Sequence, residues 1–159
     1  MKKIALSALT VIAALGMTSG AHAKSQRCAA VNAAQVEGWF KTFNDAWATK
    51  DPDTVTALFT KDAILLATVS NKPRTTPDEI ENYFESFLKS SPVGSIDSST
   101  IKISCNSIAR LGTWTVGLTN AATGVKSDVK ARYSFIYKRE GGQWKIDHLH
   151  SSMMPEPTS

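Results

Sequence analysis

The chain has 159 residues, of which 42% are hydrophobic and 20% are charged. This composition is typical of a globular protein of one domain and excludes a disordered, collagen-like or disulfide-dense chain. The formal net charge of +4 points to nucleic-acid binding only if the basic residues gather in one part of the sequence.

The first 23 residues have the pattern of a secretory signal peptide. Lys2 and Lys3 precede an apolar run over residues 4–15, and the small-residue motif Ala21-His22-Ala23 follows. The apolar run is too short to cross a bilayer as a helix. We therefore predict cleavage after Ala23, a single mature domain over residues 24–159, no membrane span, and a periplasmic or secreted location.

Removal of this segment lowers the net charge of the mature chain. Without Lys2 and Lys3, 16 basic residues remain against 14 acidic ones, and the basic residues are scattered without a cluster. A nucleic-acid partner is therefore not expected.

The two cysteines, Cys28 and Cys105, stand far apart in the sequence. In an oxidising compartment we predict that they form an internal disulfide. Two free thiols or a bridge between two chains are the alternatives.

The first half of the mature chain predicts helices with one strand between them. Residues 29–50 carry aromatic residues at helical spacing, Asp51-Pro52 begins a second, short helix, and residues 63–69 form an apolar run typical of a strand. Thr76-Pro77-Asp78-Glu79 begins a third helix, in which we expect a reciprocal capping box between Thr76 and Glu79.

Everything after Ser95 predicts strands. Apolar and polar residues alternate around Ile101 and Trp114, along residues 126–139, and again from Trp144 to Ser152 after the turn Glu140-Gly141-Gly142-Gln143. The predicted order is helix, helix, strand, helix and four strands, which makes an α+β domain with a curved antiparallel sheet wrapped around helices.

The sequence resembles the nuclear transport factor 2-like superfamily. The resemblance rests on the element order, on Leu58-Phe59-Thr60-Lys61-Asp62-Ala63, and on residues 142–152, Gly-Gln-Trp-Lys-Ile-Asp-His-Leu-His-Ser-Ser. Residues 83–88 and 126–132 are most similar to the association (hub) domain of calcium/calmodulin-dependent protein kinase II and its bacterial relatives.

The resemblance implies a cone-shaped fold, self-association through the sheet into homodimers or larger assemblies, and a pocket inside the cone. It implies no kinase, because the chain has no glycine-rich loop, catalytic loop or Asp-Phe-Gly motif. The superfamily contains enzymes and binding modules alike, so the fold fixes no activity.

Arg132 and Tyr83 are the expected pocket residues. By resemblance, Arg132 matches an arginine that reaches into the cone, where a guanidinium can hold a carboxylate. The alternative is that Arg132 faces solvent, and two other basic positions of the hub pocket read Gly117 and Ser151 here. Tyr83 lies on the apolar stripe of the third helix, from which its hydroxyl can reach the pocket.

His148 and His150 are two residues apart in a predicted strand, so their side chains share a face. We expect one of them at the pocket mouth and the other hydrogen-bonded in the sheet or at a subunit contact. A metal site is not expected, because the mature chain has no third histidine and a zinc site needs three or four ligands. No cofactor is predicted.

The predicted function is therefore a small-ligand-binding, self-associating domain whose ligand is partly apolar and can carry a carboxylate. An enzyme of the ketosteroid isomerase or polyketide cyclase type is one alternative, although no matched base–acid pair is visible and Asp147 has the wrong parity to join the two histidines. A pure oligomerisation module is the other.

Overall fold

The computed structural model describes residue 28 and residues 30–155, so the predicted signal peptide lies outside the described residues. The helices are α1 (Ala33–Thr49), α2 (Pro52–Thr56) and α3 (Pro77–Phe87), with a 3-10 turn, η1 (Leu88–Ser90), after α3. The strands are β1 (Phe59–Leu66), β2 (Val93–Ile103), β3 (Ile108–Thr119), β4 (Lys126–Glu140) and β5 (Gln143–Met153). The predicted α+β element order is confirmed.

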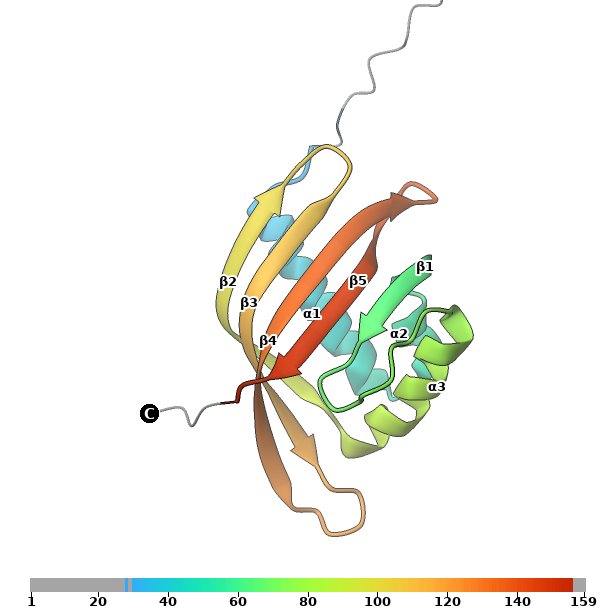
Figure 1. Ribbon diagram of the computed structural model, residues 1–159, viewed down its shortest axis with the longest axis vertical. Coiled ribbons are helices and arrows are strands. Elements are labelled where there is room, and N and C mark those ends of the chain that lie inside the picture. The colour runs from blue at the N-terminus through green and yellow to red at the C-terminus, as the bar shows by residue number, and fades with distance from the viewer. Residues whose placement is uncertain (1–27, 29, 156–159) are drawn as a thin grey trace, which may run out of the picture.

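The strands form one five-stranded sheet in the order β1-β5-β4-β3-β2. The strands β2 to β5 pair antiparallel along the chain, whereas β1 lies parallel to β5 at the edge. The sheet is therefore mixed at this edge rather than wholly antiparallel. It curves around α1, while α2 and α3 lie beside β1 (Figure 1).

Local sequence signals set the helix ends. The side chain of Asn32 accepts a hydrogen bond from the Gln35 backbone N–H at the start of α1, and Gln35 returns the contact in a capping box. Thr76 caps α3 by accepting from the Glu79 backbone N–H. The expected return bond is different, because Glu79 accepts from the backbone N–H of Thr75 instead of Thr76.

Aromatic side chains from α1, α3 and the inner face of the sheet form the core. Phe43 of α1 contacts Phe84 of α3 and Phe135 of β4, with ring centroids 6.5 and 5.4 Å apart. Trp47 and Trp114 lie 5.9 Å apart beside this cluster. Burying such side chains is the main force that holds the helices on the sheet.

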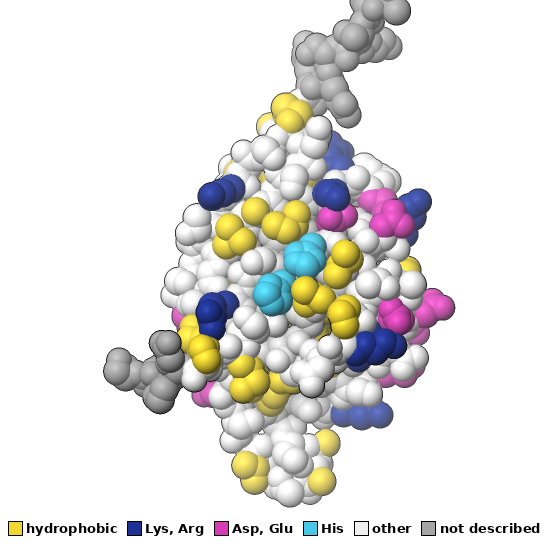
Figure 2. Space-filling model, viewed as in Figure 1, with side chains coloured by type: hydrophobic (Ala, Val, Ile, Leu, Met, Phe, Trp, Pro, Cys, Tyr) yellow, Lys and Arg dark blue, Asp and Glu magenta, His cyan; other side chains and the backbone are white. Residues whose placement is uncertain are grey.

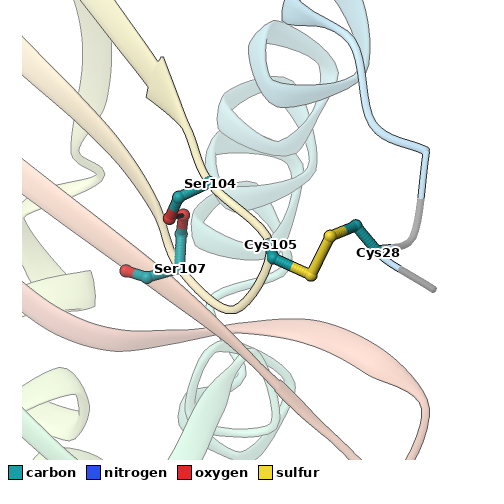
Figure 3. Close-up of a disulfide and its surroundings, with 4 residues drawn as sticks. All are labelled: Cys28, Ser104, Cys105 and Ser107. Atoms are coloured by element: carbon teal, nitrogen blue, oxygen red, sulfur yellow. Dashed lines mark hydrogen bonds between the residues drawn. A yellow bond between two sulfur atoms is a disulfide. The ribbon is translucent and has the colours of Figure 1, made fainter. Parts of the chain in front are cut away.

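A disulfide joins Cys28, before α1, to Cys105, in the turn between β2 and β3 (Figure 3). The predicted pairing is confirmed. The same turn is held by Ser104, which donates from its backbone N–H and from its hydroxyl to the carbonyl of Ser107. The cross-link therefore fixes the chain before α1 to a tight turn at one end of the sheet.

The predicted element boundaries moved most at the second helix. It ends at Thr56, and β1 begins at Phe59 and not at residue 63, so Phe59 enters the core from a strand. In the part of the chain that the structure describes, no helix has the length and apolar character needed to cross a membrane.

Candidate functional site

The hollow of the cone lies between α3, the segment after β1, and the inner face of the sheet. One part of it, the inner pocket, has a volume of about 20 Å³. Its walls are mainly aromatic and aliphatic and include Trp47, Leu65, Phe84, Trp114, Val116 and Leu149. A wider depression of about 750 Å³, the mouth cleft, lies outside it.

Four residues line both spaces, so the mouth cleft leads to the inner pocket: Val69, Tyr83, Phe87 and Leu118. Tyr83 and Phe87 stack with 5.3 Å between their ring centroids. Burial raises the pKa of the Tyr83 hydroxyl well above its ordinary value, so this group stays protonated. The entrance is therefore apolar with one neutral hydroxyl.

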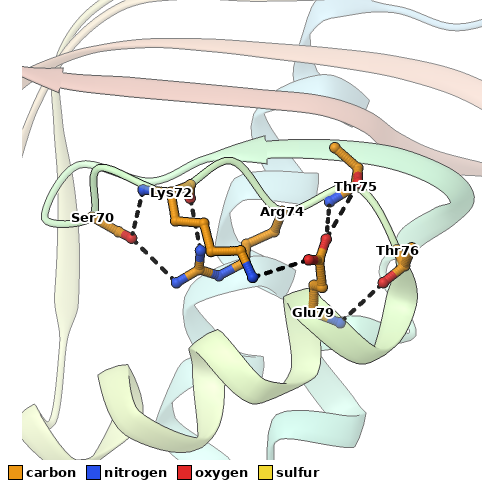
Figure 4. A network of polar contacts seen from close by, with 6 residues as sticks. All are labelled: Ser70, Lys72, Arg74, Thr75, Thr76 and Glu79. Atoms are coloured by element: carbon orange, nitrogen blue, oxygen red, sulfur yellow. Dashed lines mark hydrogen bonds and ion pairs between the residues drawn. The ribbon is translucent and has the colours of Figure 1, made fainter.

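Charged side chains surround the outer part of the mouth cleft (Figure 4). The Nζ atom of Lys72 lies 3.1 Å from the Glu79 carboxylate. The guanidinium of Arg74 donates to the carbonyl of Lys72 at 2.9 Å and to the hydroxyl of Ser70 at 3.2 Å. It also lies over the ring of Tyr83, 5.8 Å from the centroid.

This arrangement gives the two cations different partners. The Thr75 backbone N–H and Lys72 hold the pKa of Glu79 at about 2, so its carboxylate is ionised and engaged. Arg74 is half-buried, and no ion pair joins it to a carboxylate among the described residues. A guanidinium has five N–H donors, so Arg74 keeps donors available beside the cleft.

The structure separates the residues that the sequence placed in one pocket. Tyr83 lines the hollow as expected. Arg132 does not, because its side chain is exposed on the opposite face of β4 from buried Tyr133. Strand alternation sends neighbouring side chains to opposite faces, and the prediction that Arg132 reaches into the cone is corrected.

His148 and His150 also lie on the outer face of the sheet, with 6.4 Å between their ring centroids. Figure 2 shows them in the middle of that face, among apolar side chains. Burial, followed by the neighbouring His150, lowers the pKa of His148. The prediction of a histidine at the pocket mouth is therefore wrong, because both histidines lie on the outer face of the sheet.

The position of Asp147 contradicts a second expectation, namely that its side chain cannot share a face with the histidines. The pairing register shifts here, since Ile136 pairs with His148 while the next residue, Tyr137, pairs with Ile146. Asp147 is the extra residue of this bulge, which breaks the alternation. It forms an ion pair with Lys138 at 2.8 Å, on the same side as His148.

The buried arginine of this fold is Arg110 in β3, which the sequence reasoning did not single out. It is only 5% exposed, and its Nε donates to Ser99 at 3.0 Å. Arg110 does not line the inner pocket or the mouth cleft. The sequence could have predicted this burial, because Arg110 is two residues from Ile108 and therefore lies on the inward-facing side of an alternating strand.

The described residues of the hollow include no matched pair of a catalytic acid and base. The inner pocket has no carboxylate or histidine in its lining, and Asp78 and Glu79 stand only at the mouth. Among the described residues, no three or more histidine, cysteine or acidic side chains are grouped to hold a metal ion. Arg74 and Trp47 are site residues that no sequence motif marked, whereas Ser151 stands at a position that the family resemblance placed in the pocket.

Solved structures of other proteins are similar to this chain. A Xanthomonas campestris structure assigned to the calcium/calmodulin-dependent protein kinase II association domain is 42% identical, with a TM-score of 0.77, and the match covers 82% of this chain and 96% of that one. A nuclear transport factor 2-like protein from Salmonella enterica is 14% identical, with a TM-score of 0.68 and coverage of 79% and 92%.

A third structure, a ketosteroid isomerase-like protein from Erwinia carotovora, is 19% identical, with a TM-score of 0.63 and coverage of 77% and 96%. The last two likenesses show the fold alone. No curated protein sequence matches the chain. The family model for the calcium/calmodulin-dependent protein kinase II association domain matches residues 32–155, and the chain belongs to this family.

Proposed function

We propose that this domain binds a small, partly apolar molecule in the mouth cleft, with a carboxylate of the ligand on Arg74. The observation that carries the proposal is that Arg74 has no acidic partner among the described residues, while the neighbouring Lys72 is paired with Glu79. A bidentate guanidinium–carboxylate contact is short and strong. The apolar body of the ligand would lie against Tyr83, Phe87 and Leu118.

The cleft also suits such a ligand in size. Its volume of about 750 Å³ falls within the roughly 300–1,000 Å³ that is typical of small-molecule sites. The acidic side chains do not cancel Arg74, because Glu79 is engaged by Lys72 and Thr75 and Asp78 is exposed in the first turn of α3.

The test compares carboxylates with their neutral esters. Phenylacetate, benzoate and octanoate are titrated against their methyl esters by calorimetry and by tryptophan fluorescence, since Trp47 and Trp114 line the inner pocket. We expect the carboxylate to bind at least ~10-fold more tightly than its ester, and this preference to disappear in Arg74→Met. Arg132→Met is the matched control and should keep it. Equal binding of acids and esters to the unmodified protein would refute the role of Arg74.

A second function, self-association, is supported by the outer face of the sheet. We define the outer-face patch as Ile64, Leu66, Ala109, Leu111, Ile136, His148 and His150, which strand pairing places side by side. Ile64 is 42% exposed, which is unusual for a large apolar residue in the middle of a strand. We propose that a second copy of this chain covers the patch, in keeping with membership of an association domain family.

Light scattering tests this part separately. Ile136→Lys places a charge in the patch and should shift the protein towards the monomer, because an unpaired buried charge is costly. Val125→Lys is the control, since Val125 is 63% exposed in the β3–β4 turn, outside the patch. If the unmodified protein stays monomeric at high concentration, the proposal of self-association is contradicted.

We further propose that the mature protein is periplasmic or secreted and begins at Lys24. The Cys28–Cys105 disulfide supports this location, because such bonds persist in oxidising compartments. Cell fractionation followed by mass spectrometry tests this proposal. We expect a chain that begins at Lys24 in the periplasmic or secreted fraction. A protein that stays in the cytoplasmic fraction with its N-terminal segment intact would contradict it.

A further inference from the structure

Ser151 places a hydroxyl group at the inner pocket with its acceptor capacity already used. It is 5% exposed and lines the pocket. Its Oγ atom accepts a hydrogen bond from Trp114 Nε1 at 3.0 Å and another from the Thr68 hydroxyl at 2.5 Å. A hydroxyl oxygen has two lone pairs and one proton. The proton of Ser151 therefore remains to be donated, and none of the hydrogen bonds between described residues uses it.

Trp47 is a second lining residue of the inner pocket with an unused donor. Its side chain lines the pocket and is 3% exposed. Its indole Nε1–H is shielded from solvent and has no acceptor among the described residues. Buried polar groups in folded proteins almost always have a partner, and each exception calls for an explanation such as a bound molecule. Two lining residues of the pocket thus carry unused donors.

The size of the inner pocket limits what can meet these donors. A volume of about 20 Å³ has room for about one water molecule or one small functional group. Because Val69, Tyr83, Phe87 and Leu118 line both spaces, a ligand in the mouth cleft can insert its tip while its body stays outside. Only the chemistry of that tip is therefore selected by Ser151 and Trp47.

We infer that the buried tip of the ligand is a carbonyl oxygen, which accepts hydrogen bonds and donates none. This inference rests on the proposed function, since it requires a ligand in the mouth cleft. An alkyl tip would leave both donors unpaired, whereas a carbonyl oxygen has a lone pair for each of them. A site built to hydrogen-bond one group rejects the analogue that lacks it.

A pair of shape-matched probes tests the inference without using Arg74. 4-Phenylbutan-2-one and its isostere 2-methyl-4-phenylbut-1-ene differ only in C=O against C=CH₂, and neither is charged. Binding is followed through the indole N–H signals in a ¹⁵N-labelled protein, with the Trp47 signal assigned from Trp47→Phe. We expect the ketone to bind at least ~10-fold more tightly and to move the Trp47 indole proton downfield, while the isostere leaves it unchanged.

Variants separate the roles of the two donors. Ser151→Ala and Trp47→Phe should each reduce the preference for the ketone, whereas Trp144→Phe, which lies outside the pocket lining, should keep it. Equal binding of ketone and isostere would overturn the inference and leave the small-ligand proposal standing. Binding of neither probe, with carboxylates still bound, would place the ligand wholly in the mouth cleft and also overturn it. If no ligand of either kind binds, the proposed function itself fails.

Discussion

The guanidinium of Arg110 lies over the ring of Phe40, with 5.3 Å between its central carbon and the ring centroid. Its Nε is bonded to Ser99, but its buried Nη1 has no partner among the described residues. A buried charge without an acidic partner is costly to desolvate. Arg110 therefore contributes packing on Phe40 at an electrostatic cost.

Replacement of Arg110 by methionine should for this reason be tolerated. Methionine keeps contact with Phe40 and removes the unpaired donor, so we expect the free energy of unfolding to be unchanged or higher by about 1–2 kcal/mol. Arg110→Ala leaves a cavity and should lose about 2–4 kcal/mol. Urea denaturation measures both variants. A large loss in Arg110→Met would mean that the guanidinium has a partner that the present contacts do not include.

The disulfide should contribute strongly to stability. Cys28 and Cys105 are separated by 77 residues, and closing a loop of this length stabilises a protein by up to about 4 kcal/mol in the chain-entropy model. We expect the Cys28→Ser/Cys105→Ser double variant to lose stability in this range. The unmodified protein in reductant is the control and should match the double variant. A melting temperature that does not respond to reductant would contradict the prediction.

Two glycines should respond to alanine in opposite ways. At Gly112 an added Cβ would lie 2.0 Å from the carbonyl oxygen of Ser98, at the irregularity of β2, whereas at Gly38 in α1 it would meet nothing within 4 Å. Gly112→Ala should therefore be strongly destabilising. Gly38→Ala should stabilise by about 0.5–1 kcal/mol, because alanine is the better helix former. Thermal unfolding of the two variants, measured side by side, checks the sign of each change.

Acidification should destabilise the protein through His148. Burial and the neighbouring His150 lower the pKa of His148 from 6.5, against the opposing effects of Asp147 and the Ile64 backbone. Lys138 and Asp62, from β4 and β1, lie in the same depression. The unfolded chain therefore takes up a proton at higher pH than the folded one, so this contribution is intact above pH 6.5 and decreases as the pH falls towards the folded pKa.

Denaturation curves between about pH 7.5 and pH 5.5 test this titration range. The unmodified protein should lose more stability on acidification than His148→Gln, which removes the titrating group. Light scattering over the same range should also show weaker self-association, because protonation would place charge in the outer-face patch. An identical pH dependence in the two proteins would exclude His148 as the cause.

Arg132 shows where sequence reasoning erred about the site. The alternation of β4 puts Ala131, Tyr133 and Phe135 on the buried face and Arg132 on the other. The residues themselves therefore favoured an outward arginine, and only the family resemblance placed it in the cone. Asp147 is the opposite case, because a bulge in β5 changes parity and leaves no clear mark in the sequence.

The sequence by itself determined the element order, the caps of the second and third helices at Asp51 and Thr76, and the disulfide, because periodicity, capping residues and a single cysteine pair act locally or allow few alternatives. The tertiary structure alone decided which cation stands at the hollow and which donors lie inside it. Arg74, Trp47 and Ser151 come from a loop, a helix and a strand that are distant in sequence. The curvature of the sheet around α1 brings Trp47 and Ser151 to the inner pocket. The pairing of Lys72 with Glu79 leaves Arg74, at the mouth cleft, without an acidic partner among the described residues.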